Sequence, residues 1–345
     1  MNRQKPRVYL HCGLPKTGTT SIQLFLASKR FALRKADHDY PVVGCIGKGR
    51  PAHHNLPREI QGHPEFRPGR GTLSDVLEYV GNSADGRKVI LSSEGFTNCI
   101  CDAETLPKFM DFVAELQKRG DVKVVFTFRR FVHFFESSYL SKQKTGTGIG
   151  KDARPANAKR AEIWLSKFFG NLTRLRELLG PDGIIACDVD QKDSLTVFLA
   201  ALGLEFRKSA DSTPRKNARL GLKKAAFMHK LQYSAGKKLQ YLKPKEIMQV
   251  CLSIQESSEL TGEIYDYRII KYKQANAIQA VARRLMPTFL AHSVPKIVSP
   301  ESKFYEGIDL RDVVLSKEEI SKLLKAVPDP MVPKLKAEMP TLWMP

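Results

Sequence analysis

The sequence has few of the features that mark secreted, metal-binding or membrane-spanning proteins. Its six cysteines are scattered without a Cys-x-x-Cys pair, so neither a disulfide framework nor a zinc site is indicated. No apolar run is long enough to cross a bilayer, and the first residues, MNRQKPR, lack the apolar stretch of a signal peptide. We therefore expect a soluble cytoplasmic protein with reduced thiols.

Acidic residues are also scarce, because 36 Asp and Glu accompany 56 Lys and Arg and the net charge is +20. Residues 207–245 contain twelve basic residues and a single acid. Apolar residues recur there at helical spacing, which predicts a basic amphipathic helix. Its lysines at seven-residue spacing are Lys216, Lys223, Lys230 and Lys237. Such a face is either solvated or binds an anionic partner: an acidic glycan, the periphery of a membrane, or nucleic acid, which ranks last because no nucleic-acid module accompanies it.

The most informative segment is VYLHCGLPKTGTTSIQLFLASKR, residues 8–30. An apolar strand is followed by a loop with Gly13 and Gly18, and then by an amphipathic helix. Glycines let backbone N–H groups turn inward, and the helix N terminus adds positive charge, so this layout predicts a phosphate-binding loop. The nucleotide-triphosphate loop G-x-x-x-x-G-K-[ST] has lysine after its second glycine, where this chain has Thr19. Because Lys16 precedes that glycine instead, we expect a ligand with one phosphate at this position.

The loop Pro15-Lys16-Thr17-Gly18-Thr19-Thr20 resembles the P-K-[ST]-G-T-T loop of sulfotransferases that use 3′-phosphoadenosine 5′-phosphosulfate (PAPS), and looks most like their bacterial carbohydrate-type branch. The resemblance implies an enzyme that moves a sulfuryl group from PAPS to a hydroxyl or amine of a carbohydrate-type acceptor without a metal. It implies that these six residues hold the 5′-phosphosulfate. Lys16 would then neutralise the charge that develops on the bridging oxygen as adenosine 3′,5′-bisphosphate leaves.

A second apolar strand ends in Arg129 and Arg130 and leads into a helix. In the same family an arginine after such a strand and a serine eight residues later hold the 3′-phosphate, because an arginine fork and a hydroxyl together grip the anion. Arg129 and Ser137 have this separation, and Arg130 and Ser138 have it equally. We favour the first pair because Tyr139 follows Ser137 by two residues, as is usual in the bacterial branch.

Transfer to a hydroxyl also needs a base. The segment KVILSSEG, residues 88–95, places Glu94 after a strand that a parallel sheet brings to the same edge as the loop. A carboxylate in a partly dry cleft can take the acceptor proton, and related carbohydrate sulfotransferases use a glutamate. His53 and His54 stay open as the alternative base or as acceptor-binding residues, since histidine is common as the base in the small-molecule branch. We expect His11 to be a packed residue.

The predicted elements alternate between strands and helices. Strands are expected at 7–12, 88–92, 122–128 and 183–188. Helices are expected at 20–34, 103–119, 131–143, 158–179 and 193–202. This alternation predicts an α/β fold with a P-loop-like parallel sheet covered by helices on both faces. We expect residues 1–205 to form the PAPS-binding core and residues 206–345 a mainly helical basic extension packed on it, with a capping box at 316–319. Residues 36–75 and 144–157 are expected to be loops or lids.

Two other classes of function stay open. A nucleotide kinase or NTPase would need a carboxylate for magnesium, and Asp188 at the end of an apolar strand resembles one, although the loop lacks the usual lysine. The second class is a noncatalytic protein that binds an acidic glycan or a membrane surface through its basic helix.

Overall fold

The computed structural model describes residues 5–47, 51–83, 86–145, 157–190, 193–205, 221–235, 242–256, 269–270, 272–294, 310 and 312–343. The chain divides into two compact units, each discontinuous in sequence. The first comprises Met1–Arg130, Glu162–Lys216 and Ala282–Ser299. The second comprises Phe131–Ala161, Asn217–Val281 and Pro300–Pro345. This division differs from the single boundary expected after residue 205, because the segment that follows Arg130 belongs to the second unit and a late segment returns to the first.

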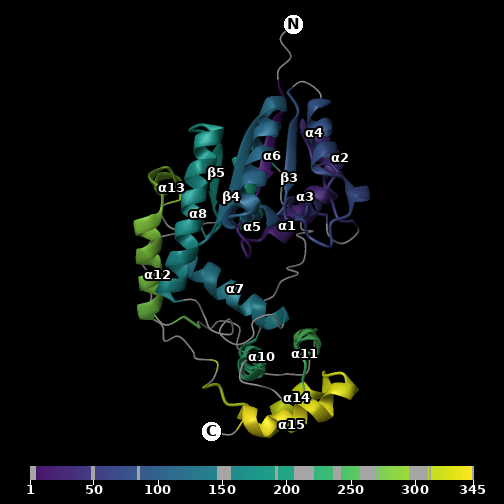
Figure 1. Cartoon of the computed structure of the whole chain (residues 1–345), viewed down its shortest axis with the longest axis vertical. Coiled ribbons are helices and arrows are strands. Elements are labelled where there is room, and N and C mark those ends of the chain that lie inside the picture. Colours follow the sequence, from purple (N-terminus) through teal and green to yellow (C-terminus); the bar gives the residue numbers. More distant parts are fainter. Residues whose placement is uncertain are drawn as a thin grey trace. The chain divides into compact units, whose positions relative to one another are not determined.

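The first unit is built on a parallel sheet (Figure 1). Its described strands follow the order β2-β3-β1-β4-β5. They are β1 (Arg7–His11), β2 (His38–Asp39), β3 (Lys88–Ser92), β4 (Asp121–Phe128) and β5 (Ile184–Asp188). The central strands β1, β3 and β4 are rich in apolar residues and are buried over most of their length, as strands covered on both faces require. All strands run in one direction, so their last residues share one edge of the sheet, here called the carboxyl edge. The expected α/β fold with a parallel sheet is confirmed.

Helices pack on both faces of this sheet (Figure 1). The described helices of this unit are α1 (Thr19–Ser28), α2 (Arg30–Lys35), α3 (Asn55–Ile60), α4 (Leu73–Gly81), α5 (Gly95–Cys101), α6 (Thr105–Arg119), most of α8 (Ala158–Leu179), α9 (Ser194–Ala201) and α13 (Thr288–Ser293), with a 3-10 turn η1 (Pro68–Arg70). On one face, Ile22 of α1 and Phe198 of α9 belong to the same buried cluster as Val125 of β4. On the other face, Phe168 of α8 packs edge to face on Phe126, with ring centroids 5.8 Å apart.

Several helices differ from the expectation. The helix expected over 20–34 is divided into α1 and α2 at Lys29. The expectation of loops over 36–75 is wrong for α3, which is only six residues long and has no side-chain cap, so its sequence carries little signal. The signal for α4 was present, because Thr72 and Asp75 form a reciprocal capping box.

Within its described residues the second unit is helical. It contains α7 (Phe131–Thr145), α10 (Leu222–Ala235), α11 (Pro244–Glu256), most of α12 (Tyr272–Leu285), α14 (Lys317–Lys325), the 3-10 turn η4 (Asp329–Met331) and α15 (Val332–Trp343). Phe227 of α10 and Leu323 of α14 belong to its apolar core, and Tyr139 of α7 is buried there with its hydroxyl 2.7 Å from His229 Nδ1. The capping box predicted at the start of α14 is confirmed by reciprocal bonds between Ser316 and Glu319.

Candidate functional site

The loop between β1 and α1 is curled by three residues in the left-handed region: Gly13 at φ +55°, Lys16 at φ +70° and Gly18 at φ +86°. A Cβ atom at Gly13 would overlap Thr19 Cγ2, and one at Gly18 would overlap the side chain of Ser194 on α9. Glycine is therefore required at both positions by conformation and by space. Lys16 adopts the same conformation with a side chain, which costs free energy that the surrounding contacts must offset.

Contacts from β4 hold this loop in place. Thr17 Oγ1 donates to the Leu14 carbonyl at 2.6 Å and lies 2.6 Å from the hydroxyl of Thr127. Arg129 Nη1 donates to the backbone carbonyl of Lys16 at 3.0 Å. Thr17 is buried and its hydroxyl makes both of these contacts inside the protein, so it stabilises the conformation of the loop. An anion on the outer side of the loop would be bound by backbone N–H groups and by Lys16.

Helix α1 starts directly from this loop, and no side chain caps its N terminus at Gly18. The first N–H groups of a helix have no partner inside the helix, and the helix dipole adds positive charge at that end. Lys16 is exposed beside it. Surrounding protein atoms lower the pKa of the Lys16 amine, and the negative charge of Glu94 acts in the opposite direction. The loop, the helix end and Lys16 together suit a phosphate group.

Glu94 lies at the carboxyl edge, two residues after Ser92 ends β3, which pairs directly with β1. Its carboxylate oxygen Oε2 accepts a hydrogen bond from Gln23 Nε2 at 2.9 Å. Its other oxygen, Oε1, lies 3.9 Å from His54 Nε2. The structure thus brings together Lys16, Glu94 and His54. The sequence analysis did not single out Gln23, whose signal was a polar side chain on the buried side of α1.

The two adjacent histidines have different surroundings. His53 is completely buried, with Nε2 3.1 Å from the carbonyl of Pro41 and Nδ1 accepting the backbone N–H of Ser92 at 3.1 Å. Burial lowers the pKa of His53 to about 3. His54 is half-buried, and its Nδ1 lies 2.7 Å from Ser93 Oγ. Of the two candidate bases, His54 therefore lies at the carboxyl edge, whereas His53 is buried and hydrogen-bonded to the backbone that holds this edge in place.

His11 is buried, as expected for a packed residue. Its ring packs against Phe198 at a centroid distance of 4.6 Å, and its Nδ1 lies 2.8 Å from Ser92 Oγ. Burial lowers the pKa of His11 to about 4, so the ring is neutral at neutral pH.

The proposed 3′-phosphate residues fall in different units. Arg129 belongs to the first unit, where its side chain donates a hydrogen bond to the carbonyl of Lys16. Ser137 and Ser138 are half-buried on α7 in the second unit. The pairing of Arg129 with Ser137, or of Arg130 with Ser138, stays a prediction.

The basic segment is described only in part, because Lys216 and Lys237 lie outside the described residues. Lys223 forms an ion pair with Glu319 inside the second unit. Lys230 donates to a backbone carbonyl of the same unit at 2.9 Å, and burial lowers its pKa. These two lysines contribute to the packing of α10, and a track for an anionic partner stays a prediction.

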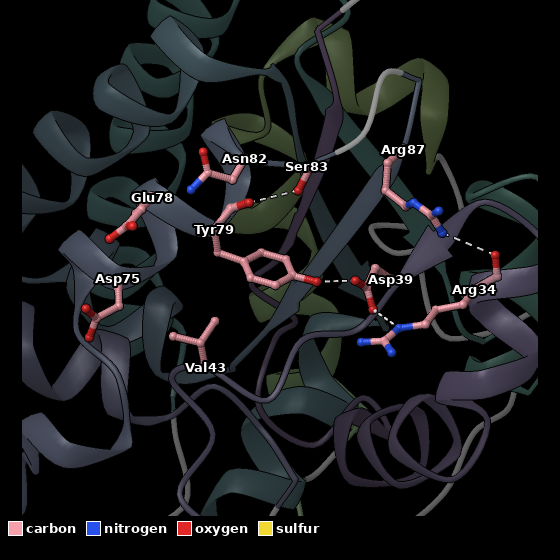
Figure 2. Close-up of a pocket in the computed structure, with 9 residues that line it drawn as sticks. All are labelled: Arg34, Asp39, Val43, Asp75, Glu78, Tyr79, Asn82, Ser83 and Arg87. Atoms are coloured by element: carbon pink, nitrogen blue, oxygen red, sulfur yellow. Dashed lines mark hydrogen bonds and ion pairs between the residues drawn. The ribbon is translucent and has the colours of Figure 1, made fainter.

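A hollow of about 580 Å³ lies elsewhere in the first unit, beside the short edge strand β2 and helix α4 (Figure 2). Tyr79 donates to the Asp39 carboxylate, and Arg34 Nε donates to the same carboxylate at 3.2 Å. Burial and Asp39 together raise the pKa of Tyr79 to about 12. None of the predicted site residues lines this hollow, and its central charges are paired with one another.

Two further observations concern metals and membranes. In the part of the chain that the structure describes, no three His, Cys, Asp or Glu side chains gather as a metal site. Asp188, the candidate magnesium ligand, ends β5, and β4 separates that strand from β1 and its loop. Over the same described ranges, no helix combines the length and the apolar character needed to cross a bilayer.

Comparisons with known proteins give one structural neighbour. It is the sulfotransferase domain of the olefin synthase from Synechococcus PCC 7002, with 14% sequence identity and a TM-score of 0.34, and the match covers 63% of this chain and 82% of that one. No model of a known protein family matches the chain, and no curated protein matches it in sequence.

Proposed function

We propose that this protein is a PAPS-dependent sulfotransferase that transfers a sulfuryl group to a hydroxyl of a carbohydrate-type acceptor. The observation that carries the proposal is the carboxyl edge of the sheet. There an uncapped helix N terminus and Lys16 lie on a phosphate-type loop, and Glu94, which follows the end of the neighbouring strand β3, acts electrostatically on that lysine. The loop sequence P-K-T-G-T-T supports a phosphosulfate rather than a triphosphate as its ligand.

Each residue has a role in this reaction. The backbone N–H groups of the loop bind the 5′-phosphosulfate, which supplies the sulfuryl group. Glu94 accepts the proton of the acceptor hydroxyl, whose oxygen forms a bond to sulfur while the bond between sulfur and the bridging oxygen breaks. The electron pair of that bond stays on the departing adenosine 3′,5′-bisphosphate, and Lys16 stabilises the new negative charge. Arg129 and Ser137 bind the 3′-phosphate.

His54 is the second candidate for the base. It lies at the same edge as Glu94, whereas both ring nitrogens of His53 lie within hydrogen-bonding distance of backbone groups. Replacement of each residue separately decides between Glu94 and His54.

The carbohydrate acceptor rests on the sequence resemblance and needs a direct test. Purified protein is incubated with sulfur-labelled PAPS and a panel of soluble acceptors: neutral oligosaccharides, acidic oligosaccharides, simple alcohols and phenols, with water as the baseline. We expect labelled product with at least one oligosaccharide. Labelled product with a phenol alone would retain sulfuryl transfer and reject the carbohydrate acceptor. Absence of transfer, together with tight binding of an acidic glycan or of anionic vesicles, would favour the noncatalytic alternative.

A further inference from the structure

We infer that Gln23 is a positioning residue for Glu94: its side-chain amide fixes one carboxylate oxygen and leaves the other to accept the proton of the acceptor. The inference rests on the proposed sulfuryl transfer, because Glu94 has this proton to accept only if that reaction takes place. It links the phosphate loop to the base through a single helix, since α1 begins at the loop and carries Gln23 one turn later.

The contacts of Gln23 carry the inference. Gln23 is four residues after Thr19, so both lie on one side of α1, and only 4% of its surface is exposed. An amide nitrogen carries two hydrogens. Nε2 donates to Glu94 Oε2 at 2.9 Å and to Ser92 Oγ at 3.4 Å. The amide therefore ties α1 to the end of β3 and to the carboxylate beyond it.

A buried network holds this amide in one orientation. The Ser92 hydroxyl accepts from Gln23, and its oxygen also lies 2.8 Å from His11 Nδ1. His11 and Ser92 are buried, and the lowered pKa of His11 keeps its ring neutral. Rotating the amide would bring its oxygen against the Glu94 carboxylate, where two acceptors would face each other.

The opposite side of Glu94 is set by His54. Ser93 Oγ accepts the backbone N–H of Gly95 at 3.2 Å and lies 2.7 Å from His54 Nδ1. The other ring nitrogen of His54, Nε2, faces Glu94 Oε1. Their separation of 3.9 Å is longer than a hydrogen bond. Oε2 is thus held by Gln23, and Oε1 is the oxygen that can take a proton.

The test is a double-mutant cycle with Gln23→Met, which keeps the length of the side chain and removes both donors. We expect Gln23→Met to lower kcat about 10- to 100-fold, the equivalent of one hydrogen bond to a charged group. The affinity for adenosine 3′,5′-bisphosphate should stay within about twofold, because the loop is unchanged. In the Glu94→Gln background the same substitution should change kcat by less than about twofold, because it acts through Glu94.

The matched control is Gln117→Met. Gln117 lies on α6, where its amide donates to the Leu178 carbonyl at 3.2 Å, outside the residues placed at the carboxyl edge. The Gln117→Met variant should keep the kcat of the wild type. An equal loss in Gln23→Met with and without Glu94, or an equal loss in Gln117→Met, would make Gln23 merely structural. Gln23→Glu, a second substitution of equal size, should reduce kcat at least as much, because a second carboxylate would then face Glu94.

A second readout is the split between kcat and KM. The loss in Gln23→Met should lie in kcat, with the KM for PAPS within about twofold of the wild type, and an equal change in both constants would overturn the inference. If the wild type transfers sulfuryl groups to no acceptor, the proposed function fails and the inference falls with it. If the wild type transfers normally and Gln23→Met does too, only the inference fails.

Discussion

The carboxyl edge of the sheet and the hollow beside β2 contain similar charged residues, which are arranged differently. In the hollow, Asp39 accepts hydrogen bonds from both Tyr79 and Arg34, so its charge is compensated inside the fold (Figure 2). At the carboxyl edge, the Glu94 carboxylate has one oxygen held by Gln23 and the other beyond hydrogen-bond distance of His54.

The volume of a cavity is therefore a weaker guide to function in this protein than the way in which its charged side chains are paired. A carboxylate with two charged or hydroxyl donors is already stabilised by the fold, and a substrate would have to displace them. A carboxylate held by one amide, close enough to a lysine to affect its pKa, keeps an oxygen for chemistry. We therefore place the proposed reaction at the carboxyl edge.

The largest effect on turnover should come from replacing the carboxylate of Glu94, and the carboxylate of Asp39 serves as its comparison. Glu94→Gln should lower turnover about 10²–10⁴-fold, the usual range for a general base, with binding of adenosine 3′,5′-bisphosphate retained. Asp39→Asn should leave turnover unchanged and lower the melting temperature, because Arg34 loses its charged partner. Steady-state kinetics and thermal unfolding of both variants check this. If Asp39→Asn lost turnover and Glu94→Gln did not, the proposed reaction would belong to the hollow and not to the carboxyl edge.

The next effect concerns the lysine of the loop. Lys16→Ala should lower turnover about 10²–10³-fold, as expected for one group that stabilises charge in the transition state. Lys29, exposed at the other end of α1, is the matched control, and Lys29→Ala should have wild-type turnover. Binding of the desulfated product should change less than turnover in Lys16→Ala. Equal activity of the two variants would remove Lys16 from the mechanism.

The adjacent histidines should separate activity from stability. His54→Gln should lower turnover by about 2- to 5-fold, the scale of a partly exposed ion pair, because it removes the imidazole 3.9 Å from Glu94 Oε1. His53→Gln should lower the free energy of unfolding by about 1–3 kcal/mol, because buried backbone groups lose their partner. Urea unfolding and kinetics test both. A greater loss of turnover in His54→Gln than in Glu94→Gln would move the base to the histidine.

Buried groups of the two regions should lower the stability of the protein at opposite ends of the pH range. The folded-state pKa is about 4 for His11 and about 3 for His53, below the ordinary value of 6.5, so the unfolded chain binds protons first. Stability should therefore fall below about pH 6.5, by up to about 1.4 kcal/mol per pH unit for each histidine. Tyr79 has a folded pKa of about 12 against an ordinary 10, so stability falls as pH rises between these values. Urea unfolding from pH 4 to 11 measures both limbs, and a flat acidic limb in the wild type would contradict the burial of the histidines.

The smallest effect extends the comparison to the second unit. Lys223 is paired with Glu319, much as Asp39 is paired in the hollow. Lys223→Gln should lower the free energy of unfolding by about 0.5–1 kcal/mol, as expected for a partly exposed ion pair. Lys245→Gln, on an exposed position of α11, should change nothing. A rise of the acceptor KM in Lys223→Gln without a change in stability would instead support a track for an anionic acceptor.

The sequence predicted the fold better than it predicted the site. The parallel sheet followed from short, mostly apolar runs such as Val122 to Phe128, which alternate along the chain with longer helical patterns. Gly13 and Gly18 were recognised because a curled loop needs glycine there. The edge strand β2 was not found, because two residues carry no periodicity.

The missing parts of the site depend on tertiary contacts. Nothing in the sequence distinguishes His53 from His54, yet burial makes one a supporting residue and leaves the other at the edge. Gln23 stands out in the sequence only as a polar residue within α1, and its role depends on β3 lying beside that helix. Lys223 looked like part of a solvated or binding face, and only the fold reveals Glu319 beside it.

The central claim is that the loop after β1 and Arg129 recognise a nucleotide with phosphates at both the 5′ and the 3′ position. Isothermal calorimetry with adenosine 3′,5′-bisphosphate and adenosine 5′-monophosphate tests it most directly. We predict that the bisphosphate binds at least about 10-fold tighter, because each charged hydrogen bond to the 3′-phosphate contributes about 1.5–3 kcal/mol. Arg129→Ala should abolish most of this difference. Equal affinity of the wild-type protein for the two nucleotides would contradict the account.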